Sequence, residues 1–330
     1  MDPAHAPRPA RRAIKYSLVG ATSKETDPDG PVKKKPLFKR QTLWWKLHLF
    51  AFLLHLAHTL VMYIPDFSAT GTLFVEYSVW EERESHHDGP PFDIYPSLSQ
   101  AGRPIELKYF VGAFTLLSAT FHLGYTLCYL PQSLGGRVFE SIIGYKRQFK
   151  QRAVVARFVE YSMSASLMLC LLAYFSGIRT LWHLILIGTI SIATQACGIL
   201  IERNLRLDGD KFTPEVYTNN WILWGFGAFY LVVVFVDILF SIGISDAHTP
   251  STEPQMPDFV WGIVIGELGI YFCFGIVQLV RMIVDHEKRN NLEMRELYFS
   301  RAELAYIILS IIAKSALAWT VFGNVLMLDR

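Results

Sequence analysis

The stretch that decides the fold is ELAYIILSIIAKSALAWTVFGNVLM, residues 303–327. Its charged side chains are Glu303 at the start and Lys314 near the middle. A helix of about 20 mostly apolar residues is long enough to span the hydrocarbon core of a bilayer. The stretch therefore predicts a transmembrane helix whose lysine lies at mid-depth, at least roughly 16 Å from either end at about 1.5 Å per residue.

Six more apolar runs of similar length precede this stretch. They lie at about 43–64, 108–130, 153–175, 180–201, 219–245 and 257–284. Only 18% of the chain is charged, whereas a soluble domain carries about 25% charged residues. We therefore predict an all-α membrane protein with seven transmembrane helices and no separate soluble domain.

Lysine and arginine residues are distributed unevenly between the segments that connect the predicted helices. Four segments are rich in them: 1–42, 131–152, 202–218 and 285–302. The alternate segments hold only Arg83, Arg103 and Arg179. Because lysine and arginine are retained on the cytoplasmic side, this asymmetry predicts a cytoplasmic N-terminus and a C-terminus that is extracellular or lumenal.

Two of the polar segments, 1–42 and 65–107, are long enough for their composition to predict a structure. Residues 1–42 are basic and lack an apolar core, which favours a disordered cytoplasmic arm that enforces topology; electrostatic docking on anionic lipid is the alternative. The extracellular segment 65–107 is acidic and aromatic. Alternation along residues 72–80 suggests a short strand or β-hairpin over the outer face.

Neither a metal site nor a disulfide is expected. The sequence His86-His87-Asp88 could bind a metal, but a solvated loop patch is the preferred interpretation. The four cysteines all fall inside apolar stretches, whereas a disulfide framework would place them in polar loops. The net charge of +2 gives no reason to expect a nucleic-acid partner.

Lys314 and Glu160 are the strongest candidates for a functional site. An ionisable group inside a bilayer is costly, so each one is a functional hypothesis. Ser310 lies one helical turn before Lys314 on the same face. Glu160, in the predicted third helix, is the best partner for the lysine, although the two could also form a buried ion pair that only fixes helix packing.

Histidines inside the first two predicted helices add to this candidate site. His48, His55 and His58 lie on the first helix, and His122 lies deep in the second with Ser118 one turn before it. Several intramembrane histidines beside a lysine and a glutamate are more typical of a proton-holding cavity than of isolated buried polar residues.

Taken together, these residues resemble the heliorhodopsins, a family of inverted-topology microbial-type rhodopsins. Residues 301–319 are similar to the family's retinal-attachment helix, and residues 159–168 to its third helix. Leu54-His55-Leu56 and the Ser118-to-His122 pattern match its first and second helices. The resemblance spans residues 43–328, which would form one seven-helix retinal-binding domain, and the predicted orientation of the termini also fits.

The resemblance implies a cofactor and roles for individual residues. Lys314 would carry all-trans retinal as a protonated Schiff base with Glu160 as its counterion, and the protein would form a homodimer within the lipid bilayer. The hydrogen-bonded surroundings would be Ser310, Ser118, His55, His122 and Tyr161. An apolar slot for the polyene would be formed by Met163, Ser164, Met168, Tyr271 and Phe272, which could equally be packing residues.

Three functions compete on this evidence, and none of them is enzymatic. A photosensor that informs a cytoplasmic signalling partner ranks first, light-gated or light-driven proton transport second, and a transporter or receptor without photochemistry third. The third helix has no carboxylate between Tyr161 and Phe175, which argues against an ordinary outward pump. Asp237 and Glu267, predicted in the outer half of the membrane, are the candidates for a proton pathway.

Overall fold

The computed structural model describes residues 37–63, 72–84, 92–206, 214–248 and 258–323. In this part of the chain, seven helices are long and apolar enough to cross a membrane, which confirms the seven predicted spans. They are α1 (Leu37–Met62), α2 (Leu107–Cys128), α5 (Val155–Phe175), α6 (Leu181–Asn204), α7 (Pro214–His248), α8 (Asp258–Glu287) and α9 (Leu292–Val321). Helix α1 begins before the predicted residue 43, and most of the predicted basic arm lies outside the described residues.

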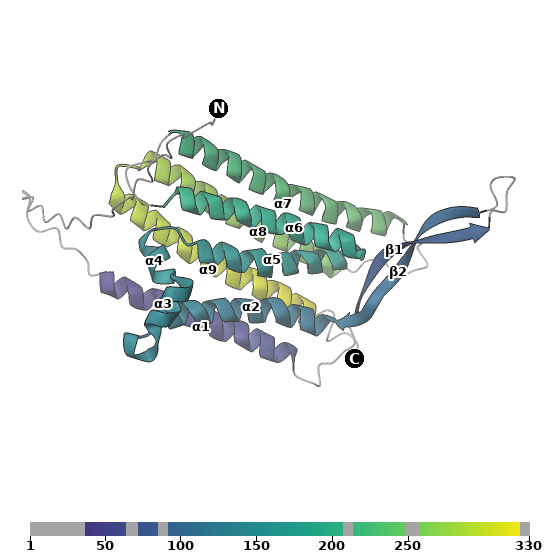
Figure 1. The fold of residues 1–330 in the computed structure, drawn as a ribbon, viewed down its shortest axis with the longest axis horizontal. Helices are drawn as coiled ribbons and strands as arrows, with labels where there is room; N and C mark the ends of the chain where they lie inside the picture. The colour runs from purple at the N-terminus through teal and green to yellow at the C-terminus, as the bar shows by residue number, and fades with distance from the viewer. Residues whose placement is uncertain (1–36, 64–71, 85–91, 207–213, 249–257, 324–330) are drawn as a thin grey trace, which may run out of the picture.

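The seven long helices form one bundle in which sequence neighbours are also spatial neighbours (Figure 1). Each packs against the next along the chain, and α9 closes the ring by contacting both α1 and α2. This closure brings the lysine-bearing last helix against the histidine-bearing first two helices. It therefore assembles, from distant parts of the sequence, the residues that the candidate site requires.

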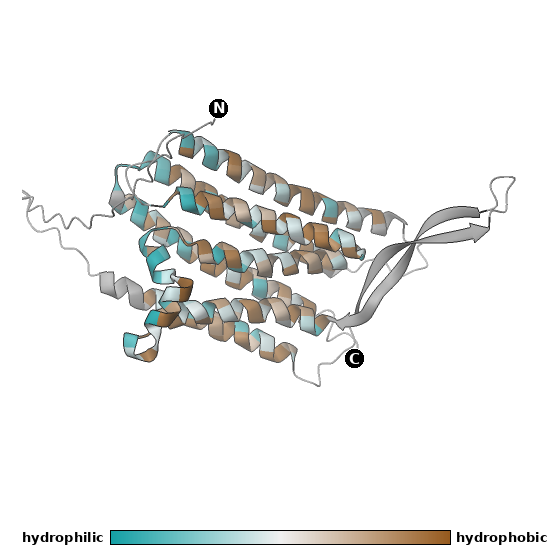
Figure 2. Cartoon of the chain, viewed as in Figure 1, coloured by the Kyte–Doolittle hydropathy of each residue, from teal (hydrophilic) through white to brown (hydrophobic). Residues whose placement is uncertain are grey.

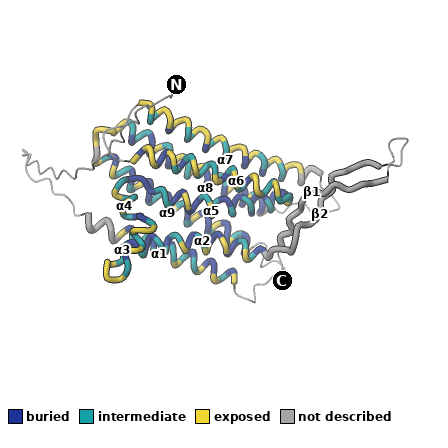
Figure 3. Tube along the Cα trace, viewed as in Figure 1, coloured by how far each residue is buried: buried dark blue, intermediate teal, exposed yellow. Residues whose placement is uncertain are grey.

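The outside of the bundle is apolar, as expected for a surface that faces lipid (Figures 2 and 3). Trp182, Phe229 and Phe240 are between 62% and 68% exposed. Water-soluble proteins rarely expose many large apolar side chains side by side. The main apolar core is drawn from all seven long helices and occupies the half of the bundle nearer the strands described next.

Two antiparallel strands extend from one end of the bundle, which we call the strand end. They are β1 (Thr72–Glu84) and β2 (Phe92–Glu106), paired from Thr72 opposite Glu106 to Glu84 opposite Phe92. They are longer than the short strand that the alternation at 72–80 suggested, and β2 leads directly into α2 at Leu107. His86-His87-Asp88 lies outside the described residues.

Short helices connect α2 to α5 at the opposite end, which we call the α3–α4 end. They are η2 (Gln132–Leu134), α3 (Gly136–Ile143) and α4 (Tyr145–Lys150). Gly144, with a φ of +66°, forms the turn between α3 and α4, a conformation that glycine adopts without steric cost. This turn places Tyr145, the residue after it, in the bundle interior, where it is 1% exposed.

Candidate functional site

Lys314 is buried at the centre of the bundle and is held by two oxygen atoms. Its side-chain nitrogen Nζ donates to Glu160 Oε1 on α5 and to Ser310 Oγ on α9, each at 2.8 Å. Lys314 is 3% exposed and Glu160 2% exposed. The Tyr161 ring lies beside the ammonium group, 5.3 Å from Nζ to the ring centroid. The structure therefore brings together the predicted lysine, carboxylate, serine and tyrosine.

An apolar cavity of about 250 Å³ opens from Lys314 into the space between α5, α6, α7, α8 and α9. Among the predicted pocket residues, six line it together with Lys314: Ser310, Tyr161, Ser164, Met168, Tyr271 and Phe272. The Tyr271 hydroxyl is satisfied within the wall of the cavity, because it donates to the Ala165 carbonyl at 3.0 Å. The cavity thus offers one lysine in a largely hydrocarbon wall, which is the chemistry that a long apolar cofactor with one reactive end requires.

Met163 does not belong to this cavity. The α5 residues that line it include Tyr161, Ser164, Ala165 and Met168, a spacing of three and four residues that follows one face of a helix. Met163 lies on another face and is 41% exposed on the outside of the bundle. The prediction that Met163 and Met168 both flank the cofactor therefore fails for Met163, because proximity in sequence does not fix the helix face.

A cluster of histidines lies on the other side of Lys314, where α1 and α2 pack together. His48 Nδ1 and His122 Nδ1 are 3.0 Å apart, so one donates to the other. The His122 ring stacks on His55 with centroids 5.7 Å apart. Toward the strand end, His58 Nε2 accepts from Trp319 Nε1 at 3.0 Å. The three predicted histidines of α1 and His122 of α2 therefore form one continuous row between these two helices.

Several polar atoms of this cluster have no hydrogen-bond partner among the described residues. They are both ring nitrogens of His55, Nε2 of His122 and Oγ of Ser118. Buried polar groups are normally hydrogen-bonded to protein or to internal water. The unpartnered atoms of His55, His122 and Ser118 are therefore the groups of this cluster that could bind internal water.

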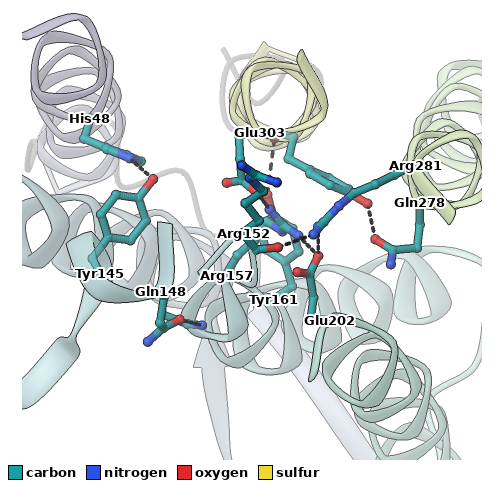
Figure 4. Close-up of polar contacts among 12 residues, drawn as sticks. His48, Tyr145, Gln148, Arg152, Arg157, Tyr161, Glu202, Gln278, Arg281 and Glu303 are labelled. Atoms are coloured by element: carbon teal, nitrogen blue, oxygen red, sulfur yellow. Dashed lines mark hydrogen bonds and ion pairs between the residues drawn. The ribbon is translucent and has the colours of Figure 1, made fainter. Parts of the chain in front are cut away.

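Tyr145 links this cluster to the α3–α4 end. Its hydroxyl lies 2.6 Å from His48 Nε2 (Figure 4). Burial raises the pKa of the Tyr145 phenol well above its usual value, so the phenol remains neutral. A small cavity of about 10 Å³ lies between Tyr145, His48, His122 and Glu160. That volume is comparable with the space that one water molecule needs.

A buried ionic network next to Glu160 was not among the predicted site residues. Arg157 donates through Nη2 to Glu202 Oε1 at 2.6 Å and through Nη1 to Glu303 Oε1. Arg281 donates to the same Glu202 oxygen and to the Arg152 carbonyl (Figure 4). The signal in the sequence was an arginine inside each of the predicted spans 153–175 and 257–284.

The two predicted proton-pathway carboxylates lie apart from the cavity wall. The Asp237 carboxylate on α7 accepts a hydrogen bond from His183 Nε2 at 2.7 Å, and both side chains are more than one-third exposed on the outside of the bundle. Glu267 on α8 is 2% exposed, and its Oε2 has no partner among the described residues. The structure therefore does not join them into one path.

These features define an integral, multi-pass membrane protein with a buried lysine in the wall of an apolar cavity. Residues 43–326 match the family model of the heliorhodopsins. The chain therefore belongs to the heliorhodopsin family, and this membership supports a retinal-binding, light-responsive protein.

Comparison with solved structures finds a light-driven proton pump LR (Mac) from Leptosphaeria maculans. It is 11% identical, the match covers 85% of this chain and 93% of that one, and the TM-score is 0.42. No curated protein matches the chain.

Proposed function

We propose that this protein is a photosensor that binds all-trans retinal covalently through Lys314. The observation that carries the proposal is the position of Lys314, which lies buried at the boundary between an apolar cavity and a carboxylate. An unmodified lysine so deep in a bilayer is costly. A bound retinal would supply a light-absorbing polyene attached to the lysine nitrogen as a Schiff base.

The surrounding side chains have distinct tasks in this proposal. Glu160, already 2.8 Å from Lys314 Nζ, is the counterion that stabilises a positive charge on the nitrogen, since a buried cation without a fixed anion tends to lose its proton. Ser310 orients the nitrogen through its hydroxyl. Met168 and Tyr271 exclude water from the apolar cavity.

The proposal is tested by removing the attachment site. We expect Lys314→Ala to fold but to stay colourless after addition of retinal, while Lys46→Ala, at an exposed position near the start of α1, forms the same visible pigment as the parent. Size-exclusion chromatography and circular dichroism establish that both variants are folded. A visible pigment in folded Lys314→Ala would refute the proposal.

The orientation of the protein belongs to the same proposal. The arginine and lysine distribution supports a cytoplasmic α3–α4 end and an extracellular or lumenal strand end. A homodimer in the bilayer would then present cytoplasmic helix ends to a signalling partner. Accessibility of a protease site added at the N-terminus, compared between intact and permeabilised cells, tests this orientation.

Light-gated or light-driven proton transport is the second candidate, and the histidine row along α1 favours it. His48, His122 and His55 extend from Tyr145 to the neighbourhood of Lys314, and His58 continues the row toward the strand end. Neutral histidines can pass protons along such a row. A sensor would not need this continuity.

Photocurrents in voltage-clamped cells distinguish the two candidates. No current from the parent protein supports the sensor. A current whose reversal potential follows the proton gradient supports a channel, and His55→Phe should then abolish it. Asp237→Asn and Glu267→Gln test the outer pathway expected from the sequence; a current that survives both substitutions removes these two carboxylates from the path.

A further inference from the structure

Helix α3 carries a row of exposed apolar side chains that the proposed light response does not explain. Leu134, just before the helix, and Val138 and Ile142 within it follow one another at four-residue spacing, so they lie close to one side. They are 64%, 58% and 74% exposed. Ile142 is among the most exposed large apolar residues in the described part of the chain.

The exposure of this row does not come from a loosely attached helix. On another side of α3, Phe139 and Ile143 pack against the cluster formed by Tyr125, Tyr145 and their neighbours. A Cβ atom at Gly124 of α2 would lie only 2.7 Å from Ile143 Cδ1, so Ile143 sits directly against the α2 backbone. This packing fixes the rotation of α3 and therefore keeps the apolar row pointing outward.

Polar groups follow α3 along the next side. Arg137 and Ser141 are exposed, and each precedes a member of the apolar row by one residue. At about 100° per residue, the sides follow in the order packed, apolar, polar around the helix. The apolar row thus lies between the bundle and the charged edge, which is the arrangement of a helix that lies in a membrane interface.

The place of α3 in the fold agrees with that arrangement. Helix α3 lies at the end of the bundle where α2 ends and α5 begins, and it runs across the direction of α1 and α2 rather than along it (Figure 1). Further exposed basic residues, Arg147 and Lys150, follow on α4. Basic side chains at this level would meet lipid phosphate groups.

We propose that α3 is an interfacial membrane anchor. Leu134, Val138 and Ile142 insert into the outer part of the acyl layer, while Arg137 binds lipid phosphate groups. Docking of α3 on the bilayer holds the Gly144 turn, and through it the Tyr145 hydroxyl that contacts His48. The occupant of the apolar row is therefore the bilayer that surrounds the bundle, whose apolar sides already face lipid.

Spin labels measure the depth of α3 in phosphatidylcholine nanodiscs. Cysteines introduced one at a time at positions 138, 142 and 141 carry the label, in a chain whose exposed or partly exposed native cysteines, Cys170, Cys197 and Cys273, are replaced by serine. We expect labels at 138 and 142 to collide with oxygen and to be shielded from a water-soluble nickel reagent. At the matched control position 141, we expect the label to collide with the nickel reagent and less often with oxygen. The visible absorption of each sample establishes that the labelled variant is folded.

Photocrosslinking of the unaltered chain gives a second measurement. A phosphatidylcholine with a diazirine on its acyl chain should form adducts on residues 134–142, and α4 should give several-fold fewer. Equal access of the nickel reagent to positions 138, 141 and 142 would overturn the anchor and favour a protein partner on this row. Absence of acyl-chain adducts from residues 134–142 would overturn it as well.

Discussion

Arg157 is the residue whose removal should most disturb the buried ionic network. It is 4% exposed and bridges Glu202 on α6 to Glu303 on α9, and its guanidinium group lies 3.8 Å from the Tyr306 ring centroid. Arg157→Met keeps most of the side-chain volume but removes the charge. Glu202 still accepts from Arg281, whereas Glu303 loses the hydrogen-bonded cation that neutralises it.

The distances set the size of the effect. At 2.6 Å from Arg157 Nη2 to Glu202 Oε1, the attraction of one pair is about 6 kcal/mol at an effective dielectric constant of about 20. Desolvation offsets part of this, and removing one partner of a buried pair costs about 3–5 kcal/mol. We expect Arg157→Met to lower the free energy of unfolding by that amount. Adding Glu303→Gln should recover part of the loss, because it removes the unpaired charge.

The assay is unfolding in mixed micelles with increasing mole fraction of sodium dodecyl sulfate, followed by circular dichroism. Arg203→Met is the matched control, since Arg203 is exposed at the end of α6 and should change the unfolding free energy by less than about 0.5 kcal/mol. A loss below about 1 kcal/mol in Arg157→Met, or a double variant less stable than Arg157→Met, would contradict the structural role assigned to the network.

Three further predictions concern the cavity and the helix contacts around it. Glu160→Gln should shift the visible absorption of the pigment to longer wavelength, because the carboxylate stabilises the ground state more than the excited state; an unchanged spectrum would place the counterion elsewhere. Met168→Ala should change the spectrum of the pigment and Met163→Ala should not, since only the former lines the cavity; equal shifts would contradict this assignment. Gly198→Ala should destabilise the protein by about 1–3 kcal/mol, because its Cβ would lie 2.2 Å from a ring on α5, whereas Gly225→Ala, with open space around it, should be neutral or stabilise by up to about 1 kcal/mol in the same unfolding assay.

The fold could be predicted from the sequence because a bilayer leaves few options. Spanning segments must satisfy their own backbone hydrogen bonds, so long apolar runs become helices. The seven runs located the seven helices, with shifts of several residues where polar residues continue a helix beyond the membrane, as at the start of α9. The two helices within segment 131–152 could not be predicted in this way, since α3 and α4 are too short to form long apolar runs.

The central pair of the site could also be predicted, because single charges inside apolar runs are conspicuous. Lys314 and Glu160 stood out for that reason, and the structure places them 2.8 Å apart. Arg157 and Arg281 were equally visible as charges inside predicted spans. The ionic network that they form was not predicted, because their partner Glu202 lies near the end of α6, where a carboxylate is expected to face water.

The sequence by itself determined which segments are helices and which of them carry ionisable groups. Only the tertiary structure decided which face of each helix points inward, and so separated Met168 from Met163. It also decided that the histidines of α1 and α2 are buried inside the bundle rather than exposed to lipid. The physical reason is that hydropathy fixes the length and depth of a helix in a bilayer, whereas its rotation depends on side-chain packing against its neighbours.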